Sequence, residues 1–181
     1  MEERIHPPEG IETARLRLRP MVAGDAQAVF ETYAQDEQVT RFLTWQPHTA
    51  IDETRRYLQA CEIAWREGTA FPWALLRKSD DKLIGSVELR IDQHKAEIGY
   101  VLARPFWGQG YASEAARVLV DWAYAHPAIY RVWASCDAEN MASARVLEKA
   151  GLVFEGCLQR WVRRPGQDGL PRDVLVYAKV K

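Results

Sequence analysis

The alternation of apolar and polar residues along the chain predicts the strands of a sheet. Residues 15–19, with the sequence RLRLR, alternate at every second position, which is the period of a strand that buries one face. Short apolar runs bounded by polar turns, such as those at 79–81 and 92–95, predict further strands. The predicted strands are 15–19, 71–77, 83–91, 96–102, 130–136, 153–162 and 174–180, and the last two are joined by the polar loop 163–172.

Apolar residues that recur every three or four positions predict the helices. The predicted helices are 25–34, 49–67, 111–124 and 140–150. Thr49 is the expected N-cap of the second helix, with Asp52 at the spacing of a capping box, and Gly68 is expected to end that helix. Gly151 suits the left-handed position that follows the fourth helix.

The order of these elements predicts the fold class. One strand and two helices precede an antiparallel meander, and a β-loop-α-β-α-β-β run completes the chain. This order predicts an α/β protein with a mixed, mostly antiparallel central sheet of about six to seven strands flanked by about four helices. No internal repeat or change of composition marks a domain boundary. We therefore expect residues 1–181 to form a single domain with a loose N-terminal arm over 1–12.

Composition and charge narrow the class of protein. The chain has 181 residues, of which 48% are hydrophobic and 27% charged, which excludes a disordered or low-complexity chain. Its formal net charge of −1 favours neither nucleic acid nor a membrane surface as a partner. Neither a signal peptide nor a membrane-spanning run is visible, so we expect a cytoplasmic protein. We expect Cys61, Cys136 and Cys157 to be reduced thiols, and the four histidines lack the spacing of metal ligands.

The strongest local signal is the sequence WGQGYA at 107–112, which lies between a predicted strand and a predicted helix. Glycines let backbone N–H groups converge on one point, and the following helix adds its free amides and the positive end of its dipole, so the segment suits a phosphate. Its spacing matches neither the GxxxxGK[ST] loop of nucleotide triphosphatases nor the GxGxxG dinucleotide loop. Taken alone, the segment is also compatible with an ordinary tight turn between strand and helix.

Two longer segments together resemble a known family. The sequence GYVLARPFWGQGYASEA at 99–115 is similar to the pyrophosphate motif (R/Q)xxGx(G/A) of the GNAT superfamily of acetyl-CoA-dependent N-acetyltransferases, with Gly110 and Ala112 at the small positions. The sequence NMASARVLEKAGLVFEG at 140–156 resembles that family's second motif, AsnxxSerxxxLeuGluLysxGly. The resemblance covers most of the chain and looks closest to the subgroup that includes the ribosomal-protein N-terminal alanine acetyltransferases. It implies the GNAT fold and acetyl transfer from acetyl-CoA to a primary amine, such as a protein N-terminus, by direct attack in a ternary complex.

The resemblance also implies a set of cofactor-binding residues. The backbone amides of Gly108, Gln109, Gly110, Tyr111 and Ala112 would hold the pyrophosphate, and the strand before them, at Val101, Leu102 and Ala103, would supply an N–H donor to the thioester carbonyl. Asn140 would lie beside the pantetheine arm and Ser143, a candidate catalytic residue, near the sulfur. Without the resemblance, Asn140 is a good helix N-cap and Ser143 an ordinary polar residue of a first helical turn.

Two positions depart from the pattern of the family. Trp107 stands where many members have Arg or Gln, and Leu147 stands where many have a Tyr that protonates the leaving thiolate. The second departure leaves the acid of the reaction unassigned. It motivates an alternative in which the chain is a non-catalytic acyl-CoA-binding module. A small-molecule amine or an antibiotic is the alternative acceptor.

A polar face on the predicted hairpin 83–102 supplies a candidate base. If Ile91 pairs with Ala96 across the turn, apolar residues share one face of the hairpin, and the polar set Ser86, Glu88, Arg90, Glu97 and Gly99 shares the other. Partial burial would raise the pKa of Glu97 towards neutrality, which suits a general base, and Glu88 is a candidate substrate-binding residue. The alternatives are a cross-strand ion pair between Arg90 and Glu97 and an ordered water in place of a direct base.

Apart from Trp107, which opens the glycine segment, the seven tryptophans divide into two groups of three. Trp65, Trp122 and Trp133 are predicted to lie in the core, because they fall on apolar helix stripes or in a strand. Trp45, Trp73 and Trp161 fall in elements that border the acceptor site in the GNAT fold, and we predict that Trp45 and Trp161 wall that site. The late arginines form either a solvated cluster or a contact to an acidic substrate or the 3′-phosphate of CoA: Arg160, Arg163, Arg164 and Arg172. A monomer and a homodimer are both compatible with the sequence.

Overall fold

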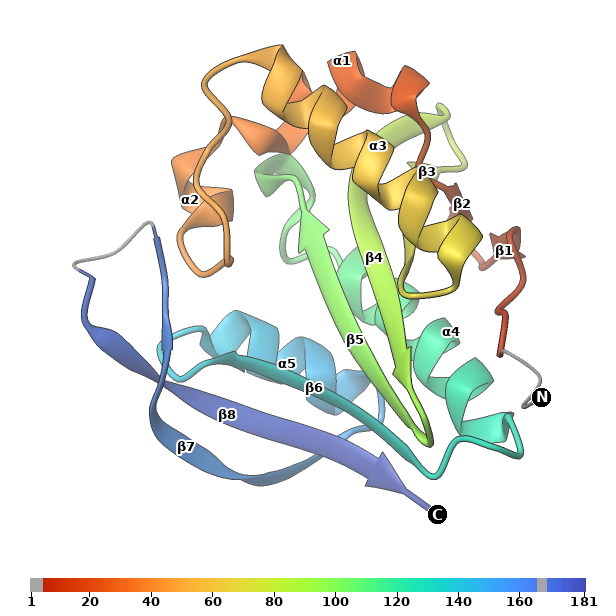
Figure 1. Ribbon diagram of the computed structural model, residues 1–181, viewed down its shortest axis with the longest axis vertical. Helices are drawn as coiled ribbons and strands as arrows, with labels where there is room; N and C mark the ends of the chain where they lie inside the picture. Colours follow the sequence, from red (N-terminus) through yellow and green to blue (C-terminus); the bar gives the residue numbers. More distant parts are fainter. Residues whose placement is uncertain (1–4, 166–168) are drawn as a thin grey trace.

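The computed structural model describes residues 5–165 and 169–181 and contains one continuous sheet (Figure 1). The order of its strands is β1-β2-β3-β4-β5-β6-β8-β7, and every neighbouring pair is antiparallel except β5 and β6, which are parallel. The strands are β1 Ile11–Glu12, β2 Leu16–Pro20, β3 Phe71–Arg77, β4 Lys82–Asp92, β5 Lys95–Leu102, β6 Arg131–Asp137, β7 Val153–Arg163 and β8 Pro171–Val180.

Helices cover both faces of this sheet, with α3 on one side and α4 and α5 on the other (Figure 1). The α-helices are α1 Ala26–Val29, α2 Glu37–Thr40, α3 Ile51–Glu67, α4 Tyr111–Ala125 and α5 Met141–Lys149. Short 3-10 segments, η1 at Ala23–Asp25 and η3 at Arg104–Phe106, and a π-helical turn, η2 at Phe30–Ala34, complete the set. The predicted mixed, mostly antiparallel α/β fold is confirmed.

The sheet has more strands than the sequence pattern predicted, because part of the expected loose arm joins it. Ile11 pairs with Leu18 of β2, and the buried Trp73 indole donates a 3.0 Å hydrogen bond to the Glu9 carbonyl. A buried indole N–H needs an acceptor, and the arm supplies it. Residues 1–4 of the arm and 166–168 of the predicted loop 163–172 lie outside the described residues.

The predicted start of the second helix is wrong by one residue. Ala50 is the N-cap of α3, and the Thr49 hydroxyl instead donates to the Glu53 carboxylate at 3.0 Å. Glu53, and not Asp52, therefore supports the first turn. The predicted helix ends are confirmed, because Gly68 at φ 67° and Gly151 at φ 94° both hold the left-handed conformation that glycine adopts without strain.

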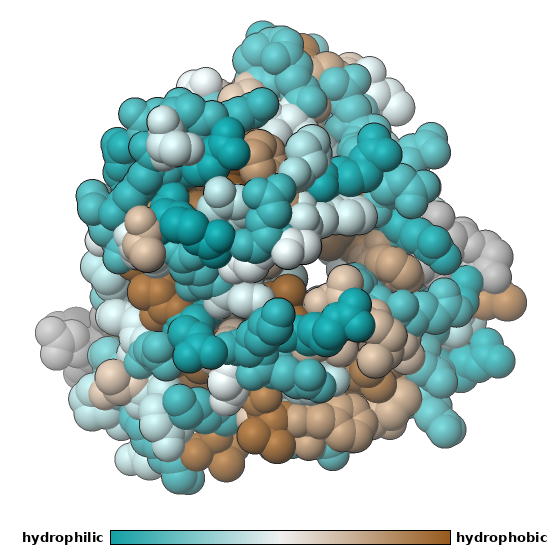
Figure 2. Space-filling view, turned by 180° about the vertical axis from the view of Figure 1, so that it is seen from behind, coloured by the Kyte–Doolittle hydropathy of each residue, from teal (hydrophilic) through white to brown (hydrophobic). Residues whose placement is uncertain are grey.

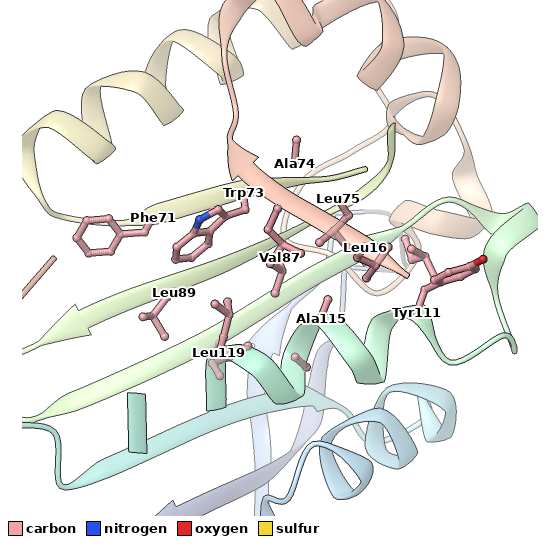
Figure 3. Packing of buried hydrophobic residues seen from close by; sticks show 14 of the residues in the cluster. Leu16, Phe71, Trp73, Ala74, Leu75, Val87, Leu89, Tyr111, Ala115 and Leu119 are labelled. Atoms are coloured by element: carbon pink, nitrogen blue, oxygen red, sulfur yellow. The ribbon is translucent and has the colours of Figure 1, made fainter. Parts of the chain in front are cut away.

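The core between the sheet and α4 fixes the position of the loop that precedes α4. Val87 and Leu89 of β4 face Ala115 and Leu119 of α4, and all four side chains are buried (Figure 3). Because these contacts hold α4 against the sheet, its N-terminus is fixed just beyond the end of β5. The glycines of 107–112 therefore lie where two rigid elements meet.

Candidate active site

An opening between β5 and β6 forms the centre of the candidate site. The parallel ladder between these strands contains only three residue pairs, from Lys95↔Arg131 to Glu97↔Trp133. Beyond Glu97 the two strands diverge (Figure 1), and no strand of the described ranges 5–165 and 169–181 pairs with this edge of β5. The space-filling view shows the surface hollowed near its middle (Figure 2). Backbone groups on the free edge of β5 can therefore reach a ligand.

The glycine loop leaves the N-terminus of α4 open. Gly108 and Gly110 have φ values of 73° and 83°, and Gly110 is the N-cap of α4. A glycine carries no side chain that could accept from the first N–H groups of the helix. In α5, by contrast, Asn140 accepts a 3.1 Å hydrogen bond from the Ser143 N–H. The free amides and positive dipole end of α4 thus face the solvent side of the loop, as an anion site requires.

Arg15 of the chain before β2 holds this loop from the outside, a role that the sequence pattern did not reveal. Its guanidinium donates to the Gln109 carbonyl at 2.8 Å and to the Glu114 carboxylate at 2.7 Å, and it lies 4.4 Å from the centre of the Tyr111 ring. The partners are almost a hundred positions apart in the sequence, so no local signal announces the contact.

Trp107 closes the loop from its other end. The Trp107 indole N–H donates a 2.6 Å hydrogen bond to the Leu102 carbonyl. The Ala103 N–H donates to the Ile84 carbonyl at 2.9 Å, and because N–H groups alternate between the two edges of a strand, Val101 also faces β4, so Leu102 is the candidate for a free N–H donor. Gly85 is required opposite them, because a Cβ at this position would collide with the Val101 carbonyl.

The β4–β5 hairpin has the predicted register, but the ion pair of Arg90 differs from the cross-strand pair that was the alternative role for Glu97. Arg90 and Glu97 are cross-strand partners, yet the Arg90 guanidinium lies 2.5 Å from the Glu88 carboxylate of its own strand. Burial raises the pKa of Glu97 above its ordinary value, and the nearby Arg90 opposes this only in part. Burial also raises the pKa of Glu88. Gly99, directly opposite Glu88, leaves open space beside this carboxylate.

Ser143 faces Tyr100, which lies opposite Val87 on the apolar face of the β4–β5 hairpin. The Tyr100 hydroxyl of β5 lies 2.6 Å from Ser143 Oγ and 3.1 Å from the Ser143 carbonyl oxygen. Leu147, one helical turn further along α5, is buried in the core. The Cys136 thiol of β6 is close enough to the Ser143 hydroxyl for that contact to act on its pKa, which burial raises to about 11.

Trp45 and Trp161, the two tryptophans that are predicted to wall the acceptor site, differ from Trp73 in their surroundings. Trp73 is fully buried and packs against Trp65 at 5.0 Å between ring centres, so this ring belongs to the core. Trp45 is half-buried and lies 5.1 Å from the His48 ring, whereas Trp161 of β7 is 68% exposed. Gln46, next to Trp45, donates to the Pro165 carbonyl at 3.2 Å. The loop that carries Trp45 therefore approaches the end of the β7 strand that carries Trp161.

The late arginines do not form one solvated cluster. Arg164 is buried, with its Nε 3.9 Å from the buried Asp137 carboxylate, and Arg172 donates to Glu139 at 3.0 Å. These contacts tie the β7–β8 hairpin to the end of β6.

Among residues 5–165 and 169–181, no group of three or more His, Cys, Asp or Glu side chains is placed to hold a metal ion. No helix in the same part of the chain is long and apolar enough to cross a membrane.

A family model described as an acetyltransferase (GNAT) domain matches residues 15–153, which include the glycine loop, β5, β6 and α5. The chain belongs to the GNAT acetyltransferase family. As a member of this family it is an acetyl-CoA-dependent acetyltransferase. The uncapped N-terminus of α4 and the open backbone edge of β5 fit a ligand that carries phosphates and an extended amide-containing arm.

The sequences of relatives align with most of this chain. An uncharacterized N-acetyltransferase of Bacillus subtilis, YoaA, is 32% identical over 94% of this chain and 96% of its own length. The ribosomal-protein-serine acetyltransferase of Escherichia coli is 30% identical over 65% of this chain and 67% of its own length. A solved structure of RimL, a ribosomal L7/L12 alpha-N-protein acetyltransferase in complex with coenzyme A, has the same fold. It superposes with a TM-score of 0.84 at 24% identity and covers 95% of this chain and 98% of its own.

Proposed function

We propose that this enzyme transfers an acetyl group from acetyl-CoA to a primary amine by direct attack in a ternary complex, and that the amine is a protein N-terminus. The observation that carries the proposal is the opening between β5 and β6, which lies beside the uncapped N-terminus of α4. One end of an extended ligand can bind to the amides of α4 while its other end passes between the strands.

The cofactor site uses mostly backbone groups in this proposal. The amides of Gly108 to Ala112 hold the pyrophosphate, and Leu102 donates an N–H to the thioester oxygen, where negative charge develops. Asn140 keeps its capping bond to Ser143 while its amide group faces the pantetheine arm. Acetyl-CoA supplies an activated acetyl group as a thioester, so the protein has only to bind, orient and deprotonate.

Glu97 is the proposed general base. The attacking amine must be neutral, and a carboxylate whose pKa is raised accepts a proton more readily than an ordinary glutamate. Glu97 is the last residue of the β5–β6 ladder, which places it at the apex of the opening. Its Coulombic interaction with Arg90 is outweighed by burial, which leaves the carboxylate basic.

The acceptor enters, in this proposal, between the Trp45 loop and the Trp161 hairpin. The Gln46 contact to Pro165 bridges these two segments, and Glu88 offers a carboxylate to the positive charge of an incoming N-terminus. The likeness to a ribosomal-protein-serine acetyltransferase supports a peptide acceptor over a small amine. We place the reaction in the cytoplasm, in one domain over residues 1–181 that acts as a monomer or homodimer.

A panel of acceptors tests the proposal. Purified protein is mixed with acetyl-CoA and with peptides that begin with Ser or Ala, with their N-terminally blocked forms, and with small amines such as aminoglycosides. The release of free thiol is then followed. We expect turnover with the unblocked peptides alone. Turnover only with small amines would exclude the peptide acceptor, and coenzyme A binding without any turnover would indicate a non-catalytic acyl-CoA-binding module.

A further inference from the structure

The contact between Tyr100 and Ser143 joins two elements that enclose the opening. Tyr100 lies on β5 beyond the last residue pair with β6, and Ser143 lies in the first turn of α5. Their hydroxyl oxygens are 2.6 Å apart, a short distance for two neutral hydroxyls. The Tyr100 side chain thus spans from the sheet to the helix at Ser143, the residue that the family resemblance places near the sulfur of CoA.

The proton arrangement of this pair has only two forms. Either Ser143 donates to Tyr100, or Tyr100 donates to Ser143 Oγ and leaves the serine proton for another acceptor. In the first form, the Tyr100 hydroxyl could donate its proton only to the Ser143 carbonyl oxygen, at the longer distance of 3.1 Å. That carbonyl also serves the hydrogen-bond ladder of α5, so the second form is favoured.

We propose that Tyr100 is a positioning residue, which donates to Ser143 Oγ so that the Ser143 hydroxyl proton points at the sulfur of CoA and hydrogen-bonds the thiolate. This inference rests on the proposed acetyl transfer. In the reaction the thioester carbon–sulfur bond breaks, the amine nitrogen–carbon bond forms, and the sulfur keeps the electron pair. The amine proton goes to Glu97, and the Ser143 proton stays on its hydroxyl throughout. The thiolate later takes a proton from the solvent, to which Glu97 returns its own, so no oxidant, reductant or further acid is needed.

Burial keeps the Tyr100 hydroxyl in the form that this role requires. It raises the pKa of Tyr100 well above its ordinary value, so the phenol retains its proton at neutral pH. The other titratable groups around the pair belong to β6, to α5 and to the residue that follows β7. They are the Cys136 thiol, which is also kept protonated by burial, and beyond it Asp137, Glu148 and Arg164.

Leu147 explains why the donor comes from the strand. Residues 143 and 147 are one turn apart on α5, so their side chains lie on the same face of the helix. The leucine is buried and has no proton to give. Tyr100 of β5 instead brings a phenol to that helix face. Its hydroxyl contacts Ser143, which lies one turn before Leu147.

The first test is a double-mutant cycle on turnover. Tyr100→Phe keeps the ring and removes only the donor, and we expect kcat to fall about tenfold, the value of one ordinary hydrogen bond, with KM for acetyl-CoA unchanged. Ser143→Ala should lower kcat at least as much, and adding Tyr100→Phe to it should cost nothing more. Tyr177→Phe is the matched control, because that buried hydroxyl contacts Glu148 and not Ser143.

The second test does not depend on turnover. The thiol pKa of coenzyme A bound to the protein is measured from thiolate ultraviolet absorbance, with the ligand-free protein as background for the three cysteines. We expect this pKa to be about one unit higher in Tyr100→Phe than in the wild type, which corresponds to the tenfold change. Equal thiol pKa values, or additive losses in the cycle, would overturn the proposal. If Tyr100→Phe fails to fold, 3-fluorotyrosine at position 100 keeps the donor, and a fall in turnover in that protein would also overturn it.

The two proposals fail in different ways. A wild-type protein that acetylates no amine refutes the proposed function, whatever the thiol pKa. A wild-type protein that is active and keeps its rate in Tyr100→Phe refutes only the role of Tyr100.

Discussion

Arg90 forms its ion pair with Glu88, two positions earlier on β4, although Glu97 lies directly opposite it on β5. The choice matters because an arginine held by one carboxylate stabilises the ionised form of another less strongly. Burial therefore dominates at Glu97, and its pKa is raised. The two glutamates of this polar face thereby acquire different environments, one paired and one not, which supports their different proposed roles.

Replacing Glu97 by Gln should lower kcat at neutral pH with little change in KM for acetyl-CoA, because the variant cannot accept the amine proton. The wild-type rate should rise as pH rises through the raised pKa of Glu97, since the carboxylate forms above it, and this rise should be absent from Glu97→Gln. Steady-state rates across pH check this. A Glu97→Gln profile identical to that of the wild type would leave Glu97 without a catalytic role.

Glu97→Gln should also change the stability of the folded protein. The stabilising contribution of Glu97 falls as pH rises, whereas its contribution to the rate rises. A carboxyl with a raised folded-state pKa binds its proton more tightly in the folded protein, so its favourable contribution is present below the ordinary glutamate pKa of 4.5 and is lost as pH rises through the folded pKa. Glu97→Gln removes that loss. We expect its Tm to exceed that of the wild type at pH 7 and to converge with it in acid, as thermal melts at several pH values would show.

Replacing Gly110 by Asp should abolish coenzyme A binding while the protein stays folded. The new carboxylate would sit at the N-terminus of α4, where the pyrophosphate is proposed to bind, and would repel it. Gly151→Asp is the matched control, because it places the same charge on a left-handed backbone just after the C-terminal end of α5, away from the glycine loop. Calorimetry measures both affinities, and an unchanged affinity in Gly110→Asp would refute the loop as the phosphate site.

Replacing Arg15 by Lys should weaken coenzyme A binding a few-fold and leave kcat nearly unchanged. A lysine cannot contact the Gln109 carbonyl and the Glu114 carboxylate at once or cover the Tyr111 ring, so the loop loses its support. The Arg15 side chain is 44% exposed, so the cost to folding stability should be within about 1 kcal/mol. Arg17→Lys, two residues further along in β2 and paired with Asp81, should bind coenzyme A as the wild type does.

Truncating Trp45 or Trp161 to Ala should raise KM for the peptide acceptor and spare coenzyme A affinity. Both rings border the proposed acceptor entrance, whereas the glycine loop lies at the N-terminus of α4. Trp65→Ala gives the contrast, because that indole packs against Phe71 and Trp73 and donates to the Pro72 carbonyl, so its loss should lower Tm. Lost coenzyme A affinity with unchanged peptide KM would contradict the assignment of the two rings.

The sequence by itself determined the strands, the longer helices and the glycine loop, because each depends on a pattern that is local in the chain. A period-two run gave β2, short apolar runs between polar turns gave β3 and the β4–β5 hairpin, and the left-handed conformation at Gly110 depends on a glycine at that position. The N-cap of α3 was misplaced because Thr49 and Ala50 are adjacent, and only the Thr49–Glu53 contact distinguishes them.

Only the tertiary structure decided which side chains meet. Arg15 reaches Gln109, Trp73 takes its acceptor from the N-terminal arm, and Tyr100 reaches Ser143 across more than forty positions. Each of these contacts depends on the packing of elements that are distant in the chain, and packing distances have no counterpart in hydrophobic periodicity. Arg90 had two carboxylates within reach, and its choice depended on side-chain geometry that strand register alone does not fix.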